Sequence, residues 1–210
     1  MEKIKYTLYN KGWIIEKVIP SFFVRGDRMM NINRLIKNVI EQIKEAQLKL
    51  GFEREVIRLY FPVSSLNALL ETDYQDEKQM LTVLRETEEL QNTEMGSLAF
   101  SAHKGRIEIM VSPKGAEYVA KKVPDPVFLK AVIELFASNH SLTIEEICQC
   151  FEQSGREYTC EEMAPGTDFD YVVYFKDASF DEYYYCIKME MGHTIYHRFM
   201  KEDYLLLIEE

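Results

Sequence analysis

The clearest pattern in the chain is a helical one between residues 31 and 51. Apolar side chains recur there at every third or fourth position, and Gly51 follows the last of them. This spacing places the apolar side chains on one face of a helix, and glycine commonly follows a helix end. We therefore predict a helix over 31–50. Its apolar positions are Ile32, Leu35, Ile36, Val39, Ile40, Ile43, Ala46 and Leu50.

A short strand and two further helices are predicted next. The run 56–61 is rich in β-branched and aromatic residues and ends at Pro62, which predicts a strand. Ser64 or Ser65 is then expected to cap a short helix, because a serine hydroxyl can accept a hydrogen bond from an N-terminal backbone amide. A longer amphipathic helix is expected over 76–90.

A hairpin follows these helices. Two alternating runs, 98–102 and 107–111, flank His103-Lys104-Gly105-Arg106, where the glycine can take the positive φ that such turns need. Ser112-Pro113 then begins another helix, with serine as the N-cap and proline at the first helical position.

The element order over 31–112 is helix, strand, helix, helix, strand, strand. This order resembles the winged-helix variant of the helix-turn-helix fold, with residues 103–106 at the wing. Topology alone carries the resemblance, which implies that the segment 73–90 occupies the position of a recognition helix.

Pro124-Asp125-Pro126 is the predicted boundary between two units, 29–123 and 124–210. The helix after it has apolar residues on all sides and is expected to be buried nearly all round. Thr143 and Glu146 form a capping box for the next helix. An antiparallel meander then follows, with 204–208 left open as strand or helix. Its predicted strands are roughly 158–163, 171–176, 183–190 and 194–200.

The whole pattern predicts an α+β protein. Residues 1–28 fit it poorly, since they show no sustained period, and Arg25-Gly26-Asp27-Arg28 directly precedes Met29 and Met30. An almost purely purine stretch, like a bacterial ribosome-binding site, can encode that tetrapeptide. One hypothesis is that the native chain starts at Met29 or Met30, and the other is a genuine N-terminal strand or tail.

Composition restricts the function classes. The 210-residue chain is 47% hydrophobic and carries 25 Lys and Arg against 35 Asp and Glu, a net charge of −10. Such a charge repels phosphate backbones on average. Four cysteines are too few for a disulfide framework, and no stretch has the apolar length of a membrane span. We expect a cytoplasmic protein with no membrane contact.

Charge also argues against DNA binding by the segment in the recognition-helix position. Residues 73–90 carry six acidic side chains and only two basic ones. A helix that enters the major groove needs Lys and Arg to neutralise phosphates. We instead predict an acidic surface for docking protein, which includes Glu86, Glu88 and Glu89, while weak DNA binding through the wing remains an alternative.

Candidate ligand residues are scattered along the C-terminal third. His193 and His197 fall on one face of either a strand or a helix, and Glu190 could add a carboxylate. Asp170 lies in a turn that lacks the further ligands of a calcium loop. Partly exposed sheet histidines and ordinary turn residues are the alternatives for these positions, so no metal, cofactor or catalytic residue is assigned.

The C-terminal third has two other features. Tyr184, on the mixed face of a predicted strand, is a candidate contact residue because tyrosine is enriched at interfaces. Cys148-x-Cys150 has the wrong spacing for a zinc knuckle. Cys160 and Cys186 both fall on predicted strands, and the sequence does not show whether they are close.

The whole region from Met30 onward, especially residues 43–51 and 57–66, resembles a small bacterial family of unknown function, and the resemblance implies no activity. With no phosphate loop, nucleophile elbow or dinucleotide fingerprint, the sequence favours a non-enzymatic interaction or regulatory protein. An enzyme or small-ligand binder whose site is assembled from distant residues remains the alternative.

Overall fold

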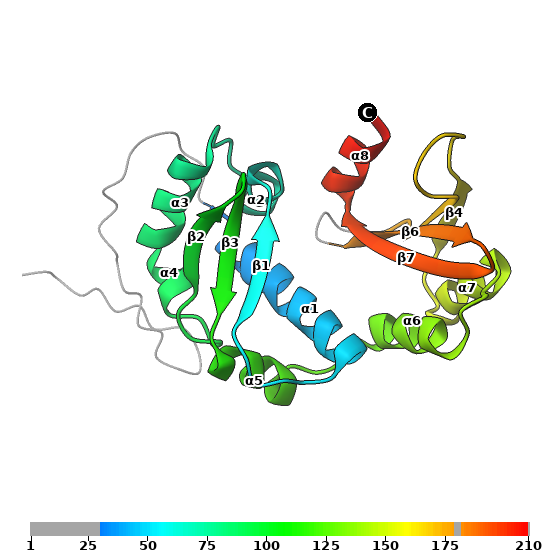
Figure 1. Ribbon diagram of the computed structural model, residues 1–210, viewed down its shortest axis with the longest axis horizontal. Coiled ribbons are helices and arrows are strands. Elements are labelled where there is room, and N and C mark those ends of the chain that lie inside the picture. The colour runs from blue at the N-terminus through cyan, green and yellow to red at the C-terminus, as the bar shows by residue number, and fades with distance from the viewer. Residues whose placement is uncertain (1–29, 179–181, 210) are drawn as a thin grey trace, which may run out of the picture.

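The computed structural model describes residues 30–178 and 182–209, and within them the chain has two antiparallel sheets with helices packed around and between them (Figure 1). The predicted α+β class is confirmed. The hypothesis about residues 1–28 concerns a segment that lies outside the described residues.

The N-terminal half is built around a three-stranded sheet of order β1-β3-β2. Hydrophobic side chains on the inner face of β3, including the fully buried Ile107 and Ile109, pack with the helices. The winged-helix resemblance stays a prediction. The elements are α1 (Ile32–Leu50), β1 (Ile57–Phe61), α2 (Val63–Leu70), α3 (Glu77–Glu86), α4 (Glu88–Gln91), β2 (Ala99–His103), β3 (Arg106–Val111) and α5 (Pro113–Lys122).

Two local predictions in this half are wrong. Neither Ser64 nor Ser65 caps α2, because the helix already begins at Val63, and the Ser65 hydroxyl donates instead to Asp203 at 2.7 Å. The helix expected over 76–90 is also broken. Thr87 takes an extended backbone conformation between α3 and α4, and its hydroxyl donates to the carbonyl of Val83.

The C-terminal half is a four-stranded meander of order β4-β5-β6-β7, as the sequence predicts. The segment 204–208, left open between strand and helix, lies in a helix that follows β7 directly. The elements are α6 (Val127–Ser138), α7 (Ile144–Gln153), β4 (Tyr158–Glu162), β5 (Tyr171–Phe175), β6 (Tyr183–Glu190), β7 (His193–Met200) and α8 (Lys201–Glu209).

Helix α6 is less buried than its sequence predicts. Leu129, Val132 and Ile133 are buried, but Val127 is 85% exposed. Helix α6 packs on α1 and α7, and its Phe128 and Phe136 contact rings of the sheet, while its opposite side faces water. Apolar residues on every side of a helix therefore do not enforce burial on every side here.

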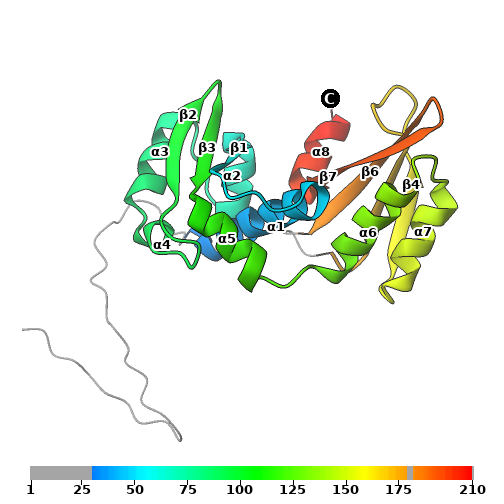
Figure 2. The same ribbon diagram turned by 60° about the horizontal axis from the view of Figure 1, so that its bottom comes forward.

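Helix α1 lies between the two halves and packs with elements of both (Figures 1 and 2). The buried ammonium group of Lys44 binds the carboxylate of Asp125 at 2.9 Å, in the predicted boundary segment, and donates to the carbonyl of Val119 at 3.2 Å. Hydrophobic residues from both halves form one continuous cluster. The division into units 29–123 and 124–210 stays a prediction.

On the side of α1 that faces β7, the contacts are mainly polar. The Arg198 side chain is 3% exposed and binds Glu41 at 3.1 Å and Glu45 at 2.6 Å, and its guanidinium lies 4.0 Å from the ring centre of Tyr183. Burial raises the pKa of Glu41, and the nearby Arg198 opposes that rise.

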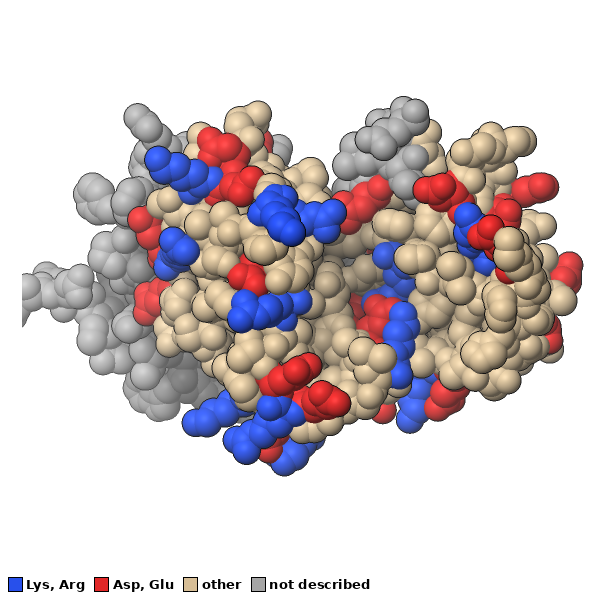
Figure 3. Space-filling model, in the orientation of Figure 1, with Lys and Arg blue, Asp and Glu red and all other residues tan. Residues whose placement is uncertain are grey.

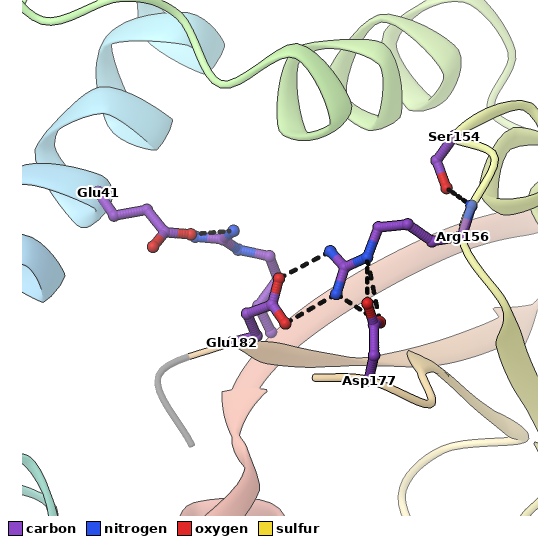
Figure 4. Close-up of polar contacts among 6 residues, drawn as sticks. Glu41, Ser154, Arg156, Asp177 and Glu182 are labelled. Carbon is purple, nitrogen blue, oxygen red and sulfur yellow. Dashed lines mark hydrogen bonds and ion pairs between the residues drawn. The ribbon is translucent and has the colours of Figure 1, made fainter. Parts of the chain in front are cut away.

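A second arginine repeats this arrangement at the surface. Arg156 binds Asp177 and Glu182, each at 2.7 Å, and lies 4.0 Å from the ring centre of Phe175, but its side chain is 34% exposed. Figure 4 shows Arg156 held between its two carboxylates, with Glu41 on the neighbouring helix.

Candidate interaction surface

The outer face of the C-terminal sheet gathers most of the candidate residues. Alternation along β6 points Tyr183, Tyr185 and Ile187 toward the helices, so the intervening side chains lie on the outer face. The pairing of β6 with β7 places Cys186 opposite His197 and Glu190 opposite His193. This face therefore combines aromatic, aliphatic and titratable side chains.

One part of the outer face is covered by aromatic packing. Tyr174 and Tyr184 stack with their ring centres 4.2 Å apart, and Tyr204 of α8 lies 5.0 Å from the Tyr184 ring. From the β4–β5 loop (163–170), the Phe169 ring lies 5.8 Å from that of Phe199. These residues form a small second core, separate from the main one.

Other side chains of β7 and of α8 are open to solvent. Ile195 is 48% exposed between the exposed His193 and His197, while Leu205 and Ile208 of α8 are 42% and 46% exposed. We call this the β7–α8 surface, and it comprises His193, Ile195, His197, Phe199, Leu205 and Ile208. Figure 1 shows α8 rising from the end of β7, facing the β4–β5 loop across the sheet.

Tyr184, the predicted contact residue, is largely covered in the described structure, and its role in contact stays a prediction. Its side chain is only 8% exposed, because Tyr204 covers it from α8 and Tyr174 stacks on it from β5. The sequence correctly places Tyr184 on the mixed face of its strand, but it does not predict that α8 packs back over this face.

The candidate ligand residues are near one another without forming a common site. The Asp170 carboxylate accepts a hydrogen bond from the backbone amide of Met189 at 2.6 Å, and Glu190 pairs with Lys188 at 3.7 Å. The His197 ring packs 5.5 Å from Phe169. Within residues 30–178 and 182–209, no three His, Cys, Asp or Glu side chains are arranged to hold a metal ion.

The predicted acidic surface lies at the other end of the molecule. Glu86 ends α3, Glu88 and Glu89 begin α4, and all three side chains are exposed. These two helices are far from the β7–α8 surface in Figure 1. Whether they dock a protein stays a prediction.

Sequence reasoning missed a polar network on the outer face of the N-terminal sheet. The Glu108 carboxylate, 7% exposed, accepts hydrogen bonds from Arg58 at 2.6 Å, from Tyr60 at 3.1 Å and from the Ser101 hydroxyl. The Ser101 and Arg58 hydrogen bonds lower the pKa of Glu108 to about 2. The network satisfies the carboxylate and holds three strands in register, which indicates a structural role.

Two open depressions lie on the C-terminal half. One, of about 340 Å³, lies at the turn between α7 and β4 and is lined by Arg156, Tyr158 and Lys176 among others. The other, of about 440 Å³, lies at the β4–β5 loop around Pro165 and Phe169. In the first, Lys176 pairs with Glu157 and Arg156 pairs with Asp177 and Glu182, so its basic groups already have acidic partners. The two depressions are therefore interpreted as ordinary surface hollows and not as a reaction centre.

Comparison with known proteins gives one match. The family DUF3877, described as "Domain of unknown function, E. rectale Gene description", matches residues 32–208. The chain belongs to the DUF3877 family. This confirms the resemblance to a family of unknown function named from a bacterium. No curated protein and no solved structure matches the chain. Among the described residues of this DUF3877 chain, no helix has the length and apolar character to cross a membrane.

Proposed function

We propose that this DUF3877 chain is a non-enzymatic protein-interaction module that binds a protein partner with the β7–α8 surface. The observation that carries the proposal is the exposure of Ile195, Leu205 and Ile208 beside the aromatic packing of the outer sheet face. Exposed aliphatic groups next to ordered aromatic rings are typical of a binding patch, because partner contact removes them from water.

The charge of the surrounding half favours a partner segment that is basic as well as apolar. Residues 124–210 contain six Lys and Arg against eighteen Asp and Glu. In Figure 3, acidic side chains lie along the outer margin of the C-terminal half, whereas Lys and Arg are interspersed with acidic side chains over the N-terminal half. Complementary charge speeds encounter and disfavours acidic competitors. The absence of disulfides among the four cysteines supports a reducing, cytoplasmic setting.

The test compares two surface variants of the full chain for capture of a partner from bacterial extract. Ile195→Thr with Leu205→Gln removes the apolar groups of the β7–α8 surface and keeps a β-branched residue in the strand. Charge reversal of Glu86, Glu88 and Glu89 to Lys tests the acidic surface of α3 and α4. All five positions are exposed, so both variants are expected to fold, with stabilities within about 0.5 kcal/mol per site of the wild type.

The proposal expects one stoichiometric protein to be retained by the wild type and by the charge-reversal variant, and to be lost with Ile195→Thr/Leu205→Gln. If only the charge-reversal variant loses the partner, the binding surface lies on α3 and α4, and the assignment to the β7–α8 surface is overturned. Retention by both variants, or capture of nothing by the wild type, would overturn the proposed function.

A further inference from the structure

Two exposed aromatic rings meet on the outer face of the N-terminal sheet. Tyr60 lies on β1 and His103 on β2, the two strands that flank β3, and their ring centres are 5.5 Å apart. Both residues are open to solvent, and Tyr60 is 42% exposed. The contact therefore forms an aromatic surface that spans the sheet.

A buried carboxylate fixes the groups around the rings. Glu108 of β3, 7% exposed, accepts hydrogen bonds from the Tyr60 hydroxyl at 3.1 Å and from Arg58 at 2.6 Å. The Arg58 side chain is nevertheless 52% exposed. A tyrosine and an arginine that are already held in one orientation lose little conformational freedom when a ligand packs on them. The face is thus preorganised for a planar partner.

The charge of this sheet differs from that of the whole chain. Its strands and hairpin turn, residues 57–61 and 99–111, contain three Lys and Arg and a single acidic residue, Glu108, while the chain carries −10. The acidic C-terminal half lies on the other side of α1 (Figure 1). Exposed charges farther apart than about 8–10 Å are largely screened at physiological salt. The charge that a ligand meets at this face is therefore set by these strands and their neighbours.

The positive charge is concentrated at the hairpin turn. Lys104 and Arg106 are exposed there, and Arg106 pairs with His103 across the strands. Glu77 of α3 approaches the same turn, since its carboxylate oxygen would lie 3.9 Å from a Cβ at position 105. This carboxylate offsets one of the two positive charges, so the turn retains a net positive charge beside the rings.

We propose that this face, formed by Arg58, Tyr60, His103 and Arg106, binds single-stranded RNA. We call it the Tyr60 face. Bases of a single strand stack on aromatic rings and on arginine guanidinium planes, and their phosphates bind Lys and Arg. Arg58 lies two residues from Tyr60 on the same side of β1, and Arg106 is opposite His103, so each ring has a cation next to it for the adjoining phosphates. A double helix keeps its bases stacked inside and would leave the rings unused.

This inference is separate from the proposed protein partner, because the Tyr60 face shares no residue with the β7–α8 surface. RNA binding should therefore persist in Ile195→Thr/Leu205→Gln, whether or not that variant loses a protein.

Fluorescence anisotropy with a labelled oligouridine of about 12 nucleotides tests the Tyr60 face in the full chain. Tyr60→Leu removes the ring, whereas Tyr60→Phe keeps the ring and removes only the hydroxyl that binds Glu108. Because stacking on one ring supplies a large share of the affinity for a single strand, Tyr60→Leu should raise Kd by roughly 5- to 150-fold. Tyr60→Phe should change Kd by less than about threefold, because the ring that stacks is kept.

A second pair of variants tests the contribution of charge. Arg106→Gln should lower the slope of log affinity against log salt concentration by about 0.7, the value for one phosphate contact with a single strand. Lys122→Gln removes the same charge from an exposed position on α5 and should leave that slope unchanged.

Three results would overturn the inference. They are no saturable binding of the oligouridine by the wild type at about 50 mM salt, equal Kd values for Tyr60→Leu and Tyr60→Phe, and equally tight binding of duplex RNA. If the wild type binds no RNA and Tyr60→Leu releases a captured protein, the face docks protein instead. If Tyr60→Leu fails to fold, His103→Ala removes the other exposed ring, and an unchanged Kd for that variant would count against stacking.

Discussion

Two arginines with nearly identical partners but different burial offer a direct test of what holds the halves together. Arg198 and Arg156 each bind two carboxylates and lie 4.0 Å from an aromatic ring centre, yet their side chains are 3% and 34% exposed. Replacing each by methionine keeps much of the apolar stem and removes the charge.

The expected loss differs between the two sites. Removing one partner of a buried ion pair costs roughly 3–5 kcal/mol, because a charge stays behind in a poorly hydrated place. After Arg198→Met, the partly buried Glu41 loses its guanidinium, while Glu45 keeps Lys49 at 2.7 Å. We therefore expect Arg198→Met to lower the free energy of unfolding by about 3 kcal/mol, the low end of this range. Arg156→Met disrupts a solvent-screened cluster and should cost below about 1 kcal/mol.

Urea unfolding followed by circular dichroism measures both losses. With a slope of about 3 kcal/mol per molar urea, the midpoint should fall by about 1 M for Arg198→Met and by at most about 0.3 M for Arg156→Met. Equal shifts for the two variants, or a larger one for Arg156→Met, would refute the assignment of stability to burial of the Arg198 pair.

The stability difference between the wild type and Arg198→Met should also depend on pH. Burial raises the pKa of Glu41 in the folded protein, so its charged form is disfavoured by folding at neutral pH. That penalty disappears as the pH falls through the folded pKa and Glu41 binds a proton. The loss in the free energy of unfolding caused by Arg198→Met should therefore become smaller between pH 7 and pH 4.5. A loss that is constant with pH would contradict this account.

Three further predictions concern single positions. The pKa of Glu108 in the folded protein is about 2, below its ordinary 4.5, so the stabilisation by this carboxylate is present above pH 4.5 and lost toward pH 2. Glu108→Gln should therefore make the stability of the protein less dependent on pH between 4.5 and 2, as measured by acid unfolding. Gly115→Ala should destabilise by about 1–3 kcal/mol in urea, since its Cβ would lie 2.6 Å from the Met95 carbonyl oxygen, although propensity alone favours alanine in α5. Thr143→Ala should cost about 1 kcal/mol by removing the α7 cap, and unchanged thermal unfolding would contradict it.

Most helices and strands could be predicted from the sequence because their signals are local. The apolar period of α1, the positive-φ turn at Lys104 and Gly105, and the capping box at Thr143 are each complete within a few residues. The local predictions that were wrong concern residues whose partners lie far away in the sequence. Ser65 turns to Asp203 instead of capping α2, a choice that depends on a residue 138 positions away.

The candidate site shows the same division. Alternation correctly assigned His193 and His197 to one face of the sheet, because a strand period of two is local. Burial of Tyr184 depends on α8 packing back over the sheet, and the hydrogen bond of Ser65 to Asp203 depends on α8 lying against α2. Neither packing arrangement has a signature in the spacing of the residues concerned.

The polar side of α1 has a consequence for synthesis of the chain. Glu41 and Glu45 precede their partner Arg198 by 157 and 153 residues. At roughly 5–20 residues per second, translation supplies that partner about 8–30 seconds after the helix itself. During this interval the helix presents carboxylates where many helices would present leucine, and water solvates carboxylates well. On the side that will receive Arg198, the early helix therefore exposes no apolar surface that could bind other nascent chains.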